Sequence, residues 1–314
     1  TNMGETMGND KLASVHKPAN ANTDGPKGLG SSYNRGNGEP ITLYVDQVVM
    51  ACTWNLDLLA ERGELFAEDA LYAGYSMIFG PGRNSEYYSE DANMSYLCGA
   101  AQVKTMQEGG LLSAIKHFVG NDQETNRHGV ATFAGEQGFR EGSLRCFEGA
   151  LRDDVGGALA TMTCFNRIGA TAGAASEATL KGILRDEWGF KGVNLTDSSK
   201  DAADYVHTEE CTVYGTDMFN NDSGRTNELI KLVRQGGDGT ILNAMKEANK
   251  HFYYAYSRSN LVNGLKVGVA VPDFVPWWQA TLIAVDVVLG VLVVVSVAAV
   301  VCGNVLNRKR KEEE

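Results

Sequence analysis

Proline is scarce in this sequence of 314 residues, which holds only 6 prolines against 36 glycines. So little proline excludes a long proline-rich linker, and abundant glycine is typical of a chain with many turns between strands and helices. A basic excess is also missing, because the formal net charge is −11 and the isoelectric point is about 5.0. This balance argues against a nucleic-acid-binding protein, which needs a basic surface.

The six cysteines lack the spacing of a metal site or a redox motif, since no two of them form a Cys-x-x-Cys pair. We therefore expect unpaired cysteines and no metal site. The chain starts at Thr1 without a signal-peptide pattern, so we expect a fragment, or the mature part of a longer protein. Its length and its 43% of apolar residues are enough for one large domain with a hydrophobic core.

The most informative stretch runs from Lys116 to Arg127 and contains an imidazole, several amides, carboxylates and cationic groups. A buried strand cannot hold so many polar groups unless each has a partner. The stretch follows a short apolar run at residues 111–115, which predicts a strand with polar groups at its end. This arrangement favours a pocket for a polyhydroxylated ligand, and a charged surface loop is the alternative.

A second segment, residues 184–197, reads as a helix end, a glycine turn, a short strand and then a carboxylate, Asp197. Around both segments, apolar residues recur at helical spacing between short apolar runs. The predicted helices span residues 55–71, 91–109, 138–152, 175–187, 226–235 and 240–256, and the predicted strands span 111–118, 158–163, 193–196 and 213–219. Alternating strands and helices indicate a parallel sheet, either a (β/α)8 barrel or a doubly wound sheet.

The C-terminal region is almost wholly apolar from Trp277 to Leu306, and Asp286 is its only charged residue. This run is longer than the ~20 residues that span a bilayer. Tryptophans precede it and the basic residues 308–311 follow it, which is typical of a transmembrane helix with a cytoplasmic C-terminus. We expect a single-pass anchor at 277–306, an extracellular body and a charged cytoplasmic tail at 307–314; a buried core helix is the alternative.

Both polar segments resemble glycoside hydrolase family 3, the β-glucosidase-like family. Lys116-His117 is similar to the family's lysine–histidine motif, and residues 193–197 are similar to the strand that bears its nucleophile. The resemblance covers residues 15–264, and further matches follow the family's order at residues 23–26, 51–55, 82–84, 86–91 and 162–166. It implies a (β/α)8 TIM-type barrel at 15–264, with a disordered or linker remnant at 1–14 and a linker at 265–276.

The resemblance also implies a retaining exo-acting glycosidase that needs no cofactor, in which Asp197 is the nucleophile and a covalent glycosyl–aspartate intermediate forms. The implied partner is an oligosaccharide or a β-glucoside. The implied substrate-binding residues are Asp24, Arg83, Lys116, His117, Arg127 and Phe165.

From the residues alone, other roles stay open. Asp24 could cap a turn, His117 could be a core histidine, Arg127 could lie on the surface and Asp197 could begin a helix.

The sequence departs from the family at several positions. Ser198 follows the nucleophile in place of a tryptophan, Phe165 replaces a tyrosine, Ser85 replaces an aromatic residue, and the stretch before Arg83 is short, which could leave the barrel incomplete. We can assign no acid/base residue, since family members carry it on a separate α/β sandwich domain. The alternatives are an N-acetylhexosaminidase, a β-xylosidase, or an inactive membrane-tethered carbohydrate-binding barrel.

Overall fold

The computed structural model describes residues 8–9, 20–29, 42–82, 88–199, 206–221, 224–236, 239–262 and 277–313. Two compact units contain these residues, at 1–265 and 266–314. The segment expected to link them, 265–276, lies outside the described residues. Within the range 1–14, the structure describes only the two-residue strand β1 (Gly8–Asn9).

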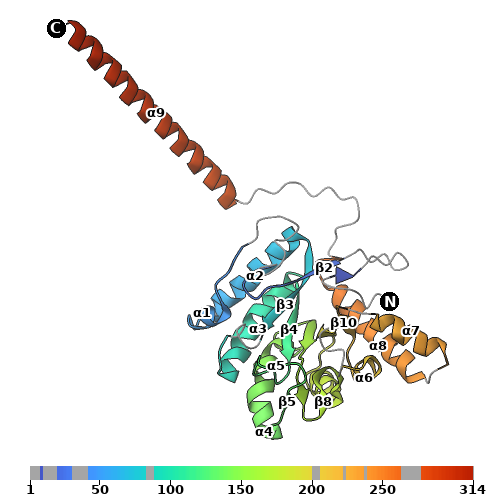
Figure 1. The fold of residues 1–314 in the computed structure, drawn as a ribbon. Helices are drawn as coiled ribbons and strands as arrows, with labels where there is room; N and C mark the ends of the chain where they lie inside the picture. The colour runs from blue at the N-terminus through green and yellow to red at the C-terminus, as the bar shows by residue number, and fades with distance from the viewer. Residues whose placement is uncertain are drawn as a thin grey trace. The chain divides into compact units, whose positions relative to one another are not determined.

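A seven-stranded sheet forms the centre of the larger unit, in the order β1-β2-β3-β4-β6-β9-β10 (Figure 1). Strands β2 to β10 are parallel, and β1 is antiparallel to β2. Because the strands are parallel, their carboxyl ends lie at the same end of the sheet, and the residues that follow the strands come together there. The strands are β2 (Asn20–Asp24), β3 (Tyr75–Gly82), β4 (Leu112–Phe118), β6 (Ala160–Thr163), β9 (Val193–Ser198) and β10 (Met218–Asn220).

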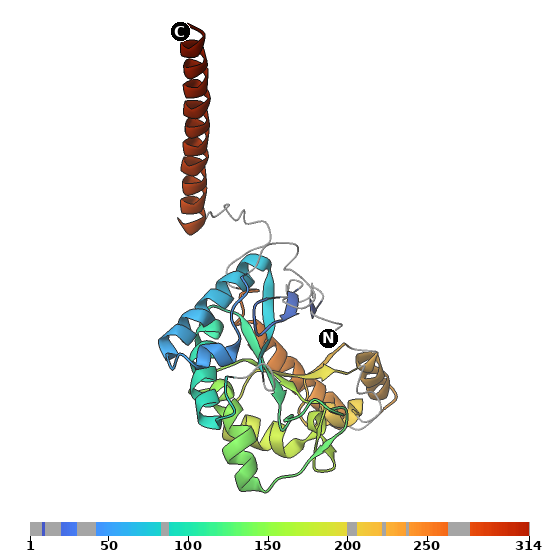
Figure 2. The same ribbon diagram turned by 60° about the vertical axis from the view of Figure 1, so that its left-hand side comes forward.

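Helices cover both faces of this curled sheet (Figure 2). One face, with Met77, Leu112 and Leu195, packs against Phe252 and Tyr256 of α8. The opposite face packs against α3, α5 and the π-helical turns of η5. The helices are α1 (Gln47–Ala51), α2 (Leu56–Ala73), α3 (Ala92–Glu108), α4 (Glu136–Gly138), η3 (Phe139–Leu144), α5 (Arg145–Leu151), η5 (Ala178–Glu187), α6 (Thr208–Val213), α7 (Arg225–Arg234) and α8 (Gly239–Tyr256).

The predicted parallel sheet with intervening helices is confirmed, whereas a closed (β/α)8 barrel is not what the described residues form. Their main sheet is a curled half-barrel, with β1 and β10 at its two edges. A small second sheet, β5 (Ala131–Thr132), β7 (Arg167–Ile168) and β8 (Thr171–Ala172), lies in the loops after β4 and β6. Residues of these loops therefore form strand pairs outside the main sheet. Helix α8 packs against the face of the main sheet that carries Met77 and Leu195.

The six predicted helices of the larger unit and three of its four predicted strands are confirmed, with small shifts at their ends. The strand predicted at 213–219 is wrong over most of its length. Helix α6 continues to Val213, Gly215 turns the chain at a φ of 116°, and only Met218–Asn220 form β10. Strands β2 and β3 were not predicted, although β3 is buried along nearly its whole length.

The smaller unit consists, in its described residues, of helix α9 (Trp277–Glu313). Residues 277–303 of this helix are long and apolar enough to cross a membrane, judged by length and composition. The helix continues beyond Leu306, where the sequence predicted that the apolar segment would end.

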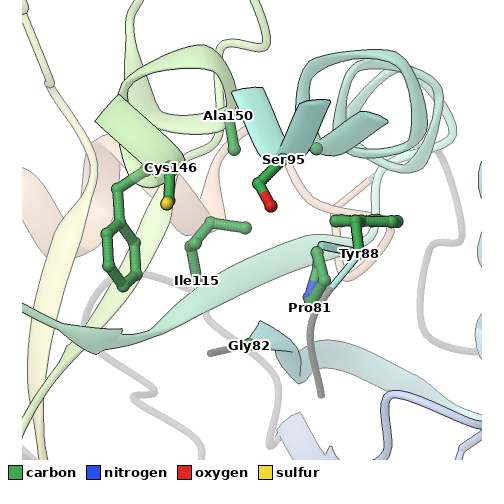
Figure 3. A pocket seen from close by; sticks show the side chains of 9 residues that line it. Pro81, Gly82, Tyr88, Ser95, Ile115, Cys146 and Ala150 are labelled. Atoms are coloured by element: carbon green, nitrogen blue, oxygen red, sulfur yellow. The ribbon is translucent and has the colours of Figure 1, made fainter. Parts of the chain in front are cut away.

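A cavity of only about 20 Å³ lies between α3, α5 and the end of β3. Figure 3 shows Ser95 and Cys146 directing their side chains into it, with Tyr88 and Pro81 on its rim. This volume holds about one water molecule, so it excludes a sugar. Gly99 of α3 also lines it, and a Cβ at Gly99 would stand 3.7 Å from the Ala150 Cβ.

We expect Gly99→Ala to stabilise the protein. A methyl group would enter free space at ordinary contact distance, and alanine favours a helix over glycine by about 1 kcal/mol. Thermal melting of the full chain should show a rise of about 2–4 °C. Gly63→Ala in α2 is the matched control, because its Cβ would collide with Thr105 and with the Gln102 carbonyl. A lower melting temperature for Gly99→Ala would contradict this account.

Candidate active site

A polar cavity of about 260 Å³ opens at the carboxyl ends of the parallel strands. Residues from β2, β3, β4, β6, β9 and β10 all reach it, although they are far apart in the sequence. The lining residues are Asp24, Phe79, Lys116, His117, Arg127, Met162, Asp197, Ser198, Asn220 and Asn221.

Asp24 and Lys116 form an ion pair across the strands that carry them. Asp24 ends β2 and Lys116 lies in β4, and Lys116 Nζ stands 2.6 Å from Asp24 Oδ1. The same oxygen accepts a hydrogen bond from the Gly25 backbone N–H at 3.1 Å. Asp24 thus caps the turn after β2 and also pairs with a lysine that is almost fully buried.

His117, the residue after Lys116 in β4, lies next to Asp197 of β9. The distance between His117 Nε2 and Asp197 Oδ2 is 3.2 Å, but the geometry is not that of a hydrogen bond, and Oδ2 has no hydrogen-bond partner among the described residues. The other carboxylate oxygen, Oδ1, accepts the Ser198 backbone N–H at 2.7 Å. One oxygen of Asp197 is therefore held in place by the backbone, while the other is buried beside His117 without a hydrogen bond among the described residues.

Burial sets the protonation of both groups. It raises the pKa of Asp197 to about 6, although the Ser198 N–H and the cations Arg127 and Lys116 act to lower that pKa. Burial, together with Lys116 and Arg127, holds the pKa of His117 well below 6.5. At neutral pH the site therefore holds an ionised Asp197 next to a neutral imidazole.

Arg127 reaches the cavity from the loop after β4. Its Nη1 stands 2.9 Å from Glu124 Oε2, and its guanidinium lies over the Phe165 ring, 4.7 Å from the ring centroid. Phe165 itself is buried and is not among the lining residues. The structure places it behind Arg127, where it supports the guanidinium.

Five of the seven predicted site residues line one cavity: Asp24, Lys116, His117, Arg127 and Asp197. Arg83, also predicted, lies outside the described residues.

Sequence reasoning did not identify Phe79, Met162, Asn220 or Asn221 as site residues. Asn220 ends β10 and Asn221 follows it. The boundaries of this strand were mispredicted, so the position of a strand end was the missing signal. Asn221 has a left-handed backbone, with φ of 53°, and its Nδ2 donates to Ser198 Oγ at 3.0 Å.

The described residues contain no cluster of three or more histidine, cysteine or acidic side chains that could hold a metal ion. No disulfide bond joins any of the six cysteines, all of which lie among the described residues. Cys164, the cysteine nearest in sequence to Phe165, is buried, and burial raises the pKa of its thiol to about 12. A thiol of this kind stays protonated and is a poor nucleophile.

Comparison with known proteins agrees with this geometry. A model of the glycosyl hydrolase family 3 N-terminal domain matches residues 18–251. Beta-glucosidase A of Butyrivibrio fibrisolvens is 33% identical over 205 residues, which are 62% of this chain and 24% of that protein. A beta-glucosidase of Rhizobium radiobacter is 30% identical over 226 residues, 68% of this chain and 27% of that protein.

Solved structures show the same similarity. Beta-glucosidase 3B from Thermotoga neapolitana in complex with glucose superposes with a TM-score of 0.70 and 26% identity, over 83% of this chain and 40% of that one. The chain thus spans about a quarter of the length of the curated relatives that it matches.

Proposed function

The chain belongs to glycosyl hydrolase family 3, and on that basis we propose that its larger unit hydrolyses the O-glycosyl bond of a β-glucoside in the cavity around Asp197. The matched relatives are beta-glucosidases, and a related structure holds glucose. A site at the carboxyl ends of the parallel strands is where barrel enzymes bind their substrates.

The observation that carries this proposal is the environment of Asp197. A retaining glycosidase needs a carboxylate whose free oxygen attacks the sugar's anomeric carbon. Asp197 lines the cavity, and the hydrogen bond from the Ser198 N–H to its Oδ1 fixes the carboxylate there. The bond from a carboxylate oxygen to the anomeric carbon forms as the bond to the leaving oxygen breaks, and water later releases the sugar from the covalent intermediate.

The charged residues around Asp197 bind the sugar ring. Asp24 accepts hydrogen bonds from hydroxyl groups, whereas Lys116 and Arg127 donate to them, and such charge-assisted bonds contribute about 1.5–3 kcal/mol each. His117 is neutral, so one of its ring nitrogens can donate a hydrogen bond to the sugar and the other can accept one. Arg83 is assigned the same role on its sequence motif alone.

The leaving group must receive a proton, and the described lining of the cavity offers no good donor. Its two carboxyl groups are Asp24, which is paired with Lys116, and Asp197, the proposed nucleophile. We propose that an α/β sandwich domain, on the same polypeptide or on a partner, supplies the acid/base. A long relative has room for such a domain, since this chain spans about a quarter of it.

The side of the cavity formed by Ser198, Asn220 and Asn221 is polar and holds no aromatic residue. It suits a hydroxyl-rich substrate. Substrates with an N-acetyl group or a pentose are less favoured, because the matched relatives are beta-glucosidases. Asp197 supplies at the cavity wall the carboxylate that a retaining glycosidase needs, and this supports catalysis over binding alone.

Helix α9 is proposed as a single-pass membrane anchor, with the catalytic unit outside and the C-terminus in the cytoplasm. The apolar residues 277–303, the two tryptophans that begin the helix and the basic residues 308–311 support this orientation. Protease protection of a C-terminal tag in sealed cells tests it, since digestion of the tag from outside would reverse the orientation.

Labelling with an activated 2-deoxy-2-fluoro-β-glucoside tests the proposed reaction. Its good leaving group needs little protonation, so the missing acid does not prevent attack. We expect mass spectrometry to find one fluoroglucosyl group on the Asp197 peptide of the full chain. No adduct, or an adduct on another residue, would reject Asp197 as the nucleophile.

The rate of this labelling should depend on pH through Asp197. Its pKa of about 6 means that the attacking carboxylate is present above pH 6 and becomes protonated below it. We expect a constant rate near pH 7–8 and a fall of about tenfold per pH unit below pH 6. Rates that remain constant down to pH 4.5 would contradict the raised pKa.

A further inference from the structure

Besides the cavity around Asp197, a second cavity large enough for a sugar, of about 200 Å³, lies beside the loop that follows β4. Residues 120–123 form one side of it, and Val130 together with β5 forms the other. None of these residues lines the cavity around Asp197. The volume is smaller than the ~300–1,000 Å³ of sites for drug-sized ligands, and it suits a single sugar ring or a smaller polyol.

Asn121 gives this second cavity its chemistry. The side chain is 98% buried, since only 2% of its surface is exposed. Its Nδ2 donates to Glu124 Oε1 at 3.2 Å, whereas its Oδ1 has no partner among the described residues. A buried carbonyl oxygen is normally hydrogen-bonded, so this acceptor calls for a donor from a ligand in the cavity.

The other lining groups narrow the class of that ligand. Asp122 disfavours an anion, and Val130 with Ala131 offers an apolar surface for C–H groups. Thr132 Oγ1 already donates to the Gly120 carbonyl at 2.9 Å and accepts from Asn166 Nδ2. A neutral polyol, with hydroxyl donors on one side and carbon-bound hydrogens on the other, matches this lining.

A hydrogen bond and an ion pair link this cavity to the cavity around Asp197. Asn121 Nδ2 donates to Glu124, Glu124 pairs with Arg127 at 2.9 Å, and Arg127 lines the cavity around Asp197. A donor on Asn121 Oδ1 would fix the amide with its Nδ2 toward Glu124. Fixing the amide would in turn hold the Glu124 carboxylate on Arg127.

We propose that the cavity beside Asn121 is an accessory site for a neutral sugar or polyol, and that its occupancy orders Arg127 through Asn121 and Glu124. The proposal does not depend on any reaction at Asp197. Because coupling between sites is reciprocal, sugar in either cavity raises the affinity of the other by the same factor. The Glu124–Arg127 pair is partly exposed, so we expect a factor of about five to ten.

Equilibrium binding tests the site directly. The full chain, in a detergent without a sugar headgroup, is titrated with glucose in a calorimeter. We expect two glucose molecules per chain for wild type and one for Lys116→Met, which removes the charged group of the first cavity. One glucose per wild-type chain, with a binding curve that Asn121→Leu leaves unchanged, would overturn the proposal.

Three variants test three parts of the proposal separately: the acceptor Asn121 Oδ1, the space in the cavity, and the coupling between the two cavities. Asn121→Leu removes the acceptor and should weaken the second site by about tenfold or more. If that variant does not fold, Ala131→Trp blocks the cavity from an exposed position and should abolish the same binding event. Asn121→Asp keeps an acceptor but cannot donate to Glu124, so it should retain two sites and lose their mutual enhancement. Enhancement that persists in Asn121→Asp would show that the coupling does not pass through Asn121 and Glu124, and would overturn that part of the proposal.

A β-linked glucose disaccharide distinguishes two possible ligands for the cavity beside Asn121: the second ring of a substrate bound at Asp197, or a separate sugar molecule. If one substrate molecule spans both cavities, the wild type will bind one disaccharide more tightly than glucose, and Ala131→Trp will remove the gain. If the second cavity takes a separate sugar, two disaccharides will bind per chain. Either result requires the cavity beside Asn121, and a single disaccharide with no gain in affinity over glucose would count against it.

Discussion

Asp197→Ala should reduce turnover of activated aryl β-glucosides by about 10⁴-fold or more, because it removes the attacking oxygen and the advantage of a nucleophile already held in position. The wild-type chain should cleave substrates with good leaving groups and spare those with poor ones, since its described cavity offers no acid for the leaving oxygen. Hydrolysis rates for a series of aryl β-glucosides, measured with wild type and variant, test both expectations.

Asp186→Ala is the control for this experiment, since Asp186 is an exposed carboxylate of η5 that lies outside the cavity. It should leave every rate unchanged. Equal turnover of good and poor leaving groups would mean that the chain holds an acid of its own. Turnover that survives Asp197→Ala would instead favour a carbohydrate-binding role for the cavity.

Asp217→Asn should destabilise the protein by about 3–5 kcal/mol, because it removes the negative charge from a buried group of charges. Asp217 is 3% exposed and lies just before β10, away from the cavity. Its Oδ2 stands 2.7 Å from Arg185 Nη2 and accepts the Asn194 N–H, and its Oδ1 stands 2.9 Å from His251 Nδ1. Without the carboxylate, the charge of the mostly buried Arg185 guanidinium is no longer balanced.

Thermal or denaturant melting of the full chain measures this loss. Glu187→Gln is the comparison, because Glu187 also pairs with an arginine, Arg140, but both side chains are exposed. That variant should melt close to wild type, since exposed ion pairs contribute little to stability. A melting temperature for Asp217→Asn equal to that of Glu187→Gln would show that burial does not strengthen the Arg185 pair.

Most of the cavity around Asp197 could be predicted because its key residues lie at strand ends. Asp197 follows the alternating residues 193–196, and Lys116 with His117 closes a mostly apolar run, so parallel pairing of their strands brings them together. Asn220 and Asn221 could not be predicted in the same way, since residues 213–219 have apolar side chains at both ends and do not distinguish the end of α6 from a strand. Gly215 lies between those ends, and a single glycine does not define where β10 begins.

The sequence indicated that the barrel could be incomplete, but it did not predict a half-barrel. Helical and strand periodicity specify which face of each element is apolar, but they do not specify how many strands meet at the edges of the sheet. Phe252 and Tyr256 of α8 have the same spacing whether the helix lies outside a closed barrel or against one face of an open sheet. The contacts of Met77 and Leu195 with α8 decide between these arrangements, and they depend on tertiary packing.

The opposite pKa shifts of Asp197 and His117 separate the protein's acid stability from its acid activity. Folding raises the pKa of Asp197 to about 6, above that of an unfolded aspartate, and lowers the pKa of His117 well below the 6.5 of an unfolded histidine. In mild acid the folded chain therefore takes up a proton on Asp197 more readily than the unfolded chain does, and takes one up on His117 less readily. Because pH changes stability only through net proton uptake, the two opposite shifts offset each other in the free energy of unfolding. Mild acid should thus stop the proposed enzyme at Asp197 with little loss of stability from this pair, and a return to neutral pH should restore its activity.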